Sequence, residues 1–247
     1  YYMKETVYDI LIKNTRILTE DMKIRTGVDV AVKDGIIASI CDSGSHVPAE
    51  ADQTVDGSRL LWMPGLTDGH MHTCQQLLRG KILDALPMIW TRIMLPFEST
   101  LTPEAVSLSA ALCSLEMIRG GTTAFLDAGG IHMDQAAEVY IKSGLRGALT
   151  LSTMDDTKVP DSMRADAAES ISRLNEYYDT WNGSGDGRLS VCYSLRSLIS
   201  CSEELIRGVF EAADERSAMV EAHMNEYPNE INYHLERYQI RPVEYLD

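Results

Sequence analysis

The sequence lacks the features that would place it in a membrane, in a secretory pathway or in a disulfide-bonded scaffold. Its uninterrupted apolar runs fall far short of the roughly 18 residues that span a bilayer, so we expect no membrane partner. No charged stretch followed by an apolar one opens the chain, so we expect no secretion leader. The cysteines are odd in number and form no Cys-x-x-Cys pair: Cys41, Cys74, Cys113, Cys192 and Cys201. This pattern predicts reduced thiols in a cytoplasmic protein.

Basic residues are also scarce. The chain has 22 Lys and Arg against 37 Asp and Glu, which gives a formal net charge of −15. Such a surface repels phosphate backbones, and no local basic stripe compensates, so we expect no nucleic-acid partner. The apolar fraction of 45% is normal for a globular core and excludes wholesale disorder.

Short strands are predicted in the first part of the chain, at residues 7–12, 28–32, 35–40 and 60–63. Asp34-Gly35 predicts a two-residue hairpin between two of them, because glycine tolerates the positive φ of a type I′ turn. Residues 43–52 are expected to form a loop. This β module is too thin to bury a core alone, so we interpret residues 1–62 as the N-terminal part of a small β-sandwich domain.

From residue 63 onward, predicted strands alternate with predicted helices. The strands are expected at residues 122–127, 146–153, 189–195 and 218–223, and the helices at 102–119, 133–143, 161–180 and 202–216. This alternation predicts βαβ units and a parallel sheet. With the strand before His70 there are five strands. The α/β fold class expected for residues 63–247 is therefore the first part of a (β/α)8 TIM-like barrel, with too few strands to close it.

Two histidines, His70 and His72, lie one residue apart at the end of the first strand in this series. Residues i and i+2 of a strand face the same side, so both imidazoles can point at one metal ion. A bare His-x-His is weak evidence, because it can also be two unrelated polar side chains at a strand end. In a parallel barrel, however, active-site residues lie at the C-terminal ends of strands. His132, Arg196 and His223 also follow predicted strands, which favours a shared site.

Three of these residues, His70, His72 and His223, can bind one borderline-soft divalent ion, for which zinc and ferrous iron are the candidates. A metal-bound water loses its proton near neutral pH and becomes a nucleophile. Glu226, three residues after His223, is placed to carry that proton to a leaving amine or a ring nitrogen. The alternative for Glu226 is a solvated loop acid.

Several motifs together resemble the amidohydrolase superfamily. Its first-strand signature is similar to residues 64–72. Residues 77–80, 86–90, 95–98 and 223–226 resemble motifs of its aminohydrolase branch. That branch includes methylthioadenosine/S-adenosylhomocysteine deaminases, guanine deaminases and triazine hydrolases. The resemblance covers essentially the whole chain.

The resemblance implies a mononuclear site in which His70, His72 and His223 hold one divalent metal ion. Zinc is the first candidate for this ion and iron the second. Glu226 would be the catalytic proton shuttle. Binuclear members bridge two metals with a lysine on a middle strand, and residues 146–153 and 189–195 contain none. The resemblance also implies a further histidine from a sixth strand and an aspartate from an eighth. We therefore expect these residues to belong to a longer chain, or to be completed by another chain.

The same resemblance points to two classes of substrate. Nucleoside-type members have a ribose-contacting glutamate at the position of Glu98. Guanine deaminases have an arginine at the position of Arg196 and a glutamine at that of Gln75, and their loop after the second strand resembles Ile131-His132. An arginine donates to a ring carbonyl but cannot accept from an amine. We therefore predict hydrolytic deamination of an amino-substituted N-heterocycle, such as a guanine-like oxopurine, a pterin or a triazine, by attack of metal-bound hydroxide with release of ammonia.

Several alternatives stay open. Glu98 favours a deaminase of an adenosine derivative such as methylthioadenosine or S-adenosylhomocysteine. The same site would serve a hydrolase that expels chloride, and a non-catalytic fragment or assembly subunit is the third alternative. Arg196 could instead be a surface ion-pair partner and Gln75 a polar helix residue, and His234 is expected to be exposed on a helix. We also expect the protein to form a homo-oligomer and to bind a small heterocyclic molecule as its substrate.

Overall fold

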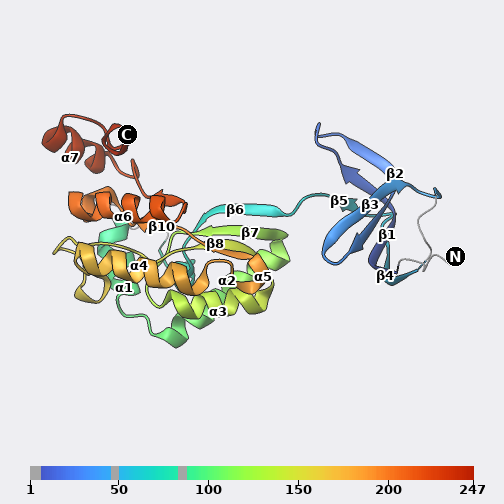
Figure 1. The fold of residues 1–247 in the computed structure, drawn as a ribbon, viewed down its shortest axis with the longest axis horizontal. Coiled ribbons are helices and arrows are strands. Elements are labelled where there is room, and N and C mark those ends of the chain that lie inside the picture. Colours follow the sequence, from blue (N-terminus) through green and yellow to red (C-terminus); the bar gives the residue numbers. More distant parts are fainter. Residues whose placement is uncertain (1–6, 46–49, 83–87) are drawn as a thin grey trace. The chain divides into compact units, whose positions relative to one another are not determined.

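The structure, a computed structural model, describes residues 7–45, 50–82 and 88–247 (Figure 1). Leu86 and Pro87, from one of the motifs that carry the family resemblance, lie outside the described residues. The chain divides into two compact units, Tyr1–Gly65 and Leu66–Asp247.

The first unit is built on one sheet. Its strand order is β3-β2-β1-β4, with β5 also paired to β1, and the strands are β1 Tyr8–Leu18, β2 Ile24–Lys33, β3 Ile36–Asp42, β4 Ala51–Asp56 and β5 Leu61–Trp62. The predicted hairpin is confirmed: Asp34 and Gly35 join the antiparallel strands β2 and β3 with φ values of 52° and 73°. Strand β4 was not predicted, because its mostly polar sequence has no apolar alternation. Its parallel pairing with β1 makes it a strand.

Parallel strands form the centre of the second unit. β6 Leu66–Met71, β7 Thr122–Asp127, β8 Arg146–Leu149 and β9 Leu189–Val191 pair in that order, and β10 Tyr193–Leu195 pairs with β11 Val220–Ala222. The strand predicted at residues 189–195 is therefore divided at Cys192. Its first half pairs with β8 and its second half with β11, while the Cys192 N–H donates to the Leu149 carbonyl at 2.9 Å.

Four long helices of the second unit lie close to their predicted positions: α2 Pro103–Gly120, α3 Met133–Ser143, α4 Ala167–Trp181 and α6 Glu203–Glu215. The helix predicted from residue 161 begins only at Ala167, because Asp166 is its N-cap and accepts from the Glu169 N–H. The other segments are η1 Thr73–Leu78, η2 Trp90–Met94, α1 Leu95–Glu98, η3 Asp161–Met163, α5 Ser184–Gly187, η4 Leu198–Ser200, α7 Pro228–Tyr238 and α8 Pro242–Leu246.

No single helix in the described part of the chain is long and apolar enough to cross a bilayer, although the bent pair Trp90–Glu98 and Pro103–Gly120 meets both criteria together.

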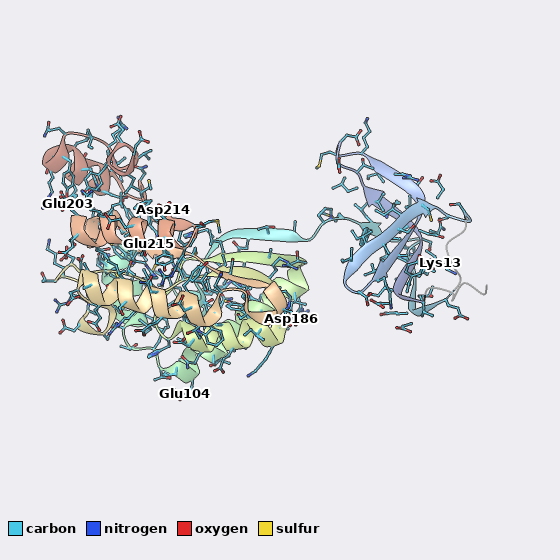
Figure 2. All side chains as sticks on the ribbon, viewed as in Figure 1. Lys13, Glu104, Asp186, Glu203, Asp214 and Glu215 are labelled. Atoms are coloured by element: carbon cyan, nitrogen blue, oxygen red, sulfur yellow. The ribbon has the colours of Figure 1, made fainter. Side chains whose placement is uncertain are left out.

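The helices bury one face on the strands and leave their charged face to solvent. Val106 of α2 and Tyr140 of α3 pack in one core cluster with Phe125 of β7. Helix α6 contributes buried residues to a second cluster, and its acidic side chains are exposed. Figure 2 labels three of these acids on α6: Glu203, Asp214 and Glu215. The negative charge of this helix therefore lies on its solvated face.

The contact between β7 and β8 leaves no room for a side chain at Gly147. Gly147 pairs with Phe125, and a Cβ there would lie 2.5 Å from a carbon of the Phe125 ring. We expect Gly147→Ala to lower the free energy of unfolding by about 1–3 kcal/mol, because overpacking forces buried neighbours to shift. Denaturant unfolding measures this change. Gly120→Ala is the matched control, because a Cβ at Gly120 meets nothing within 4 Å, and equal losses in both variants would contradict the prediction.

Candidate metal centre

Three imidazoles meet at the C-terminal ends of β6 and β11. His70 is the next-to-last residue of β6, His72 follows that strand, and His223 follows β11. One ligand nitrogen from each ring lies within 4.8 Å of the other two. The ring centroids are 4.9–5.0 Å apart in all three pairs. The structure therefore brings together the three residues that the sequence predicts as metal ligands.

The donor set fits a divalent transition-metal ion. His72 Nε2 and His223 Nε2 lie 3.1 Å apart. Two nitrogens bound to a tetrahedral zinc ion through bonds of about 2.05 Å would lie about 3.3 Å apart, so little adjustment is needed. Burial, with a smaller effect of the Arg196 charge, lowers the pKa of His72 to about 2 and that of His223 to about 4. Both rings are therefore neutral at neutral pH and have a lone pair for a metal.

The histidines open into a cavity of about 230 Å³, which is also lined by Gln75, Trp90, Met94, Arg196 and Glu226. Glu226 lies on the loop between β11 and α7, and its side chain is exposed. This placement gives a carboxylate access to the same space as the three imidazoles. Its role in proton transfer stays a prediction.

Glu98 contacts two of the other residues that were predicted to bind substrate, Gln75 and Arg196. Its Oε1 accepts from Gln75 Nε2 at 2.6 Å and from Arg196 Nη2 at 2.7 Å. Arg196 is only 2% exposed and also donates to the Gly129 carbonyl and the Ser152 hydroxyl. The alternative of a surface ion pair for Arg196 is therefore wrong, because the pair with Glu98 is buried. Glu98 Oε2 is buried and has no hydrogen-bond partner among the described residues.

His132 does not join this group. It precedes α3 in a left-handed conformation with φ of 54°, its side chain is exposed, and its Nε2 lies 3.2 Å from the Leu101 carbonyl oxygen. It lines a separate cavity of about 210 Å³ beside Leu151 and Arg173. His132 does not line the cavity shared by His70, His72 and His223, where it was predicted to contact the substrate.

A buried carboxyl beside the metal ligands was not predicted. Asp127, the last residue of β7, accepts from the backbone N–H groups of Thr73 and Gly129 at 3.4 and 3.1 Å and from the Thr73 hydroxyl. Thr73 directly follows His72, so Asp127 fixes the backbone next to a candidate metal ligand. Its position at the C-terminal end of a predicted strand was the signal that could have identified it.

Asp127 should give the protein a specific pH dependence. Burial raises its pKa to about 6, although the bonds from Thr73 and Gly129 favour the ionised form. The unfolded value is near 3.9, so the folded state binds this proton more tightly and stability falls as the pH rises from about 4 to about 6, by about 3 kcal/mol. We expect Asp127→Asn to remove this fall. Chemical denaturation of both proteins between about pH 4 and pH 6 measures their free energies of unfolding. A difference between these free energies that does not change with pH would contradict the prediction.

The profile of the amidohydrolase family matches residues 61–247. The 5-methylthioadenosine/S-adenosylhomocysteine deaminase of Halalkalibacterium halodurans is 30% identical, over 96% of this chain and 54% of the relative. The 5'-deoxyadenosine deaminase of Methanothermobacter thermautotrophicus is 34% identical, over 91% of this chain and 51% of the relative.

A solved structure gives a similar result. The adenosine deaminase from Xanthomonas campestris, crystallised with bound zinc, matches with a TM-score of 0.89 and 26% identity, over 99% of this chain and 55% of that chain. The chain thus spans about half the length of the relatives that it matches.

Proposed function

The chain belongs to the amidohydrolase family, and from that premise we propose that it provides the metal-binding half of a hydrolytic deaminase that acts on an adenosine derivative. The observation that carries the proposal is the meeting of His70, His72, His223 and Glu226 at one cavity. The named activities of the relatives, on methylthioadenosine, S-adenosylhomocysteine, 5'-deoxyadenosine and adenosine, support the choice of substrate class.

We propose that the parallel strands of the second unit are the first five of a (β/α)8 barrel, with β9 and β10 as the two halves of its fourth strand. The sheet of the first unit would be part of a small β-sandwich. A sixth-strand histidine and an eighth-strand aspartate, as the family resemblance implies, would complete the metal site from the rest of the protein. The greater length of the relatives supports this arrangement.

The chemistry follows from the chain's own residues. His70, His72 and His223 would hold one divalent ion, with zinc as the first candidate and iron as the second. Such an ion, when bound, acts as a Lewis acid that lowers the pKa of water. Glu226 takes one proton from the attacking water and delivers it to the ring nitrogen, and it then takes the second proton from the resulting hydroxyl group and delivers it to the leaving amine. One water is consumed, one ammonia is released, and the amino-bearing ring carbon becomes a carbonyl carbon.

The contacts of Glu98 favour an adenosine derivative over an oxopurine. Arg196 Nη2 and Gln75 Nε2, which the oxopurine hypothesis directs at a ring carbonyl, both donate to Glu98 Oε1. Glu98 Oε2 has no partner among the described residues, so this carboxylate keeps one free acceptor beside the two donors that it already binds. A guanine-like oxopurine, a pterin or a triazine is the second candidate, because Arg196 still lines the cavity.

An ammonia-release screen of the metal-loaded, full-length protein tests this proposal. The panel contains 5'-methylthioadenosine, 5'-deoxyadenosine, adenosine, guanine, a pterin and an amino-triazine. We expect the highest kcat/KM on an adenosine derivative. Activity on guanine, the pterin or the triazine alone would replace the first candidate with the second. No ammonia from any of them would favour the non-catalytic alternative.

A further inference from the structure

The loop between β11 and α7 contains one residue in the left-handed conformation. It carries both His223 and Glu226, with Asn225 between them at a φ of 57°. The left-handed region is uncommon for residues with a side chain, although asparagine tolerates it better than most. Asparagine permits this turn but does not require it, so contacts outside the loop can help to fix the position of Glu226.

Glu230 provides such a contact. It lies in the first turn of α7 and is 3% exposed. Its Oε2 accepts a hydrogen bond from the backbone N–H of Glu226 at 3.0 Å, and its Oε1 is buried with no partner in the described part of the chain. A buried carboxyl is unfavourable unless its hydrogen bonds compensate for the lost water. The proposed reaction does not use this group, so its burial needs another explanation.

We propose that Glu230 is a positioning residue that fixes the backbone of Glu226 and thereby aims the Glu226 carboxylate into the cavity shared by the metal histidines. This inference rests on the proposed function, in which Glu226 moves the proton. A hydrogen bond from an amide to a carboxylate is charge-assisted, and is therefore shorter and stronger than one between neutral groups. Proton transfer needs the Glu226 carboxylate to be placed accurately, because a misplacement of about 1 Å can lower the rate about 100-fold.

Further contacts fix the position of helix α7, which contains Glu230. His234 was expected to be exposed, but it is 1% exposed, and its Nδ1 lies 2.9 Å from the Glu230 carbonyl oxygen. The His234 ring lies 5.7 Å from that of Tyr238 and 5.5 Å from that of Tyr245 in α8. In Figure 1, α7 lies beyond α6 and apart from β7 and β8. This aromatic cluster therefore gives Glu230 a fixed support away from the strands.

Two substitutions separate the hydrogen bond from the size of the side chain. Glu230→Met has a similar length but no acceptor, whereas Glu230→Gln keeps a carbonyl oxygen for the Glu226 N–H. In the metal-loaded, full-length enzyme we expect Glu230→Met to lower kcat by about 10- to 100-fold, the usual range for groups that orient a site from behind. KM and the bound metal should stay unchanged, and Glu230→Gln should restore most of kcat.

A double-mutant cycle distinguishes positioning from general support of the fold. If Glu230 acts through Glu226, adding Glu230→Met to Glu226→Gln should cost nothing further. If Glu230→Met lowers kcat by the same factor in the wild-type enzyme and in Glu226→Gln, the inference is overturned. Tyr245→Leu is the packing control, because it removes a ring contact of His234 and leaves the Glu230–Glu226 bond in place. A loss of kcat in this control equal to that in Glu230→Met would also overturn the inference.

The outcomes also separate this inference from the proposed function. Full activity of Glu226→Gln would defeat both. Loss of activity in Glu226→Gln together with full activity in Glu230→Met would defeat the positioning role alone. If Glu230→Met does not fold, Glu230→Asp replaces it, because its carboxylate is one methylene too short for the Glu226 N–H. Glu230→Asp should then show the same fall in kcat at constant KM, and an unchanged kcat would overturn the inference.

Discussion

Glu226→Gln is expected to lower kcat by about 100- to 10,000-fold while KM and the bound metal stay nearly unchanged. Glutamine has the same shape as glutamate but cannot take a proton from water at neutral pH. Glu226 lines the cavity without belonging to the group of metal-binding nitrogens, so the metal ligands remain. Steady-state kinetics of the full-length protein on its best substrate, with metal analysis of the same samples, measures the effect.

The matched control is Glu236→Gln, at an exposed acid of the neighbouring helix α7. It changes the net charge by the same amount and should keep kcat within about twofold, as surface substitutions away from a site usually do. A Glu226→Gln enzyme with wild-type kcat would remove Glu226 from the mechanism. A loss accompanied by missing metal would mean that Glu226 supports the metal site instead.

His72→Ala is expected to remove the metal and, with it, the activity. Burial lowers the pKa of His72 to about 2, so its ring is neutral and available to a metal, and its Nε2 lies 3.1 Å from His223 Nε2. Substitutions behind a metal site already cost about 10- to 100-fold in affinity, so loss of a direct ligand should cost more than about 100-fold. Metal analysis after dialysis and a competition titration with a chelator measure this loss.

His132→Ala is the control for this experiment, because His132 lies outside the cavity that the metal histidines share. It should retain its metal with unchanged affinity. Retention of metal by His72→Ala with wild-type affinity would contradict the assignment of the site. Loss of metal from both variants would show that the measurement reports general unfolding.

The parts of the fold that the sequence predicts are those with a local pattern. The hairpin at Asp34-Gly35 depends on two adjacent residues, and strand β7 at Thr122–Asp127 is a short β-rich run closed by glycines. The helix caps at Thr102 and Ser202 are also local signals, and both caps are present. The three histidines could be grouped because strand ends of a parallel barrel share one face.

The parts that the sequence does not predict depend on contacts between distant residues. Glu98 and Arg196 are 98 residues apart, and no pattern around either one predicts that they form a buried pair. The position of Glu230 under Glu226 depends on the turn at Asn225, which asparagine permits but does not require. Strand β4 exists because β1 offers it an edge, so its own sequence contains little signal.

The distance along the chain between the metal ligands also sets an order of events in time. His72 and His223 are 151 residues apart. At the usual rate of synthesis of about 5–20 residues per second, roughly 8 to 30 s pass between their appearances on the ribosome. During this interval the first two histidines are an incomplete site. His70 and His72 alone supply two of the three predicted ligand nitrogens, so the three-histidine group can form only after His223 has been synthesised.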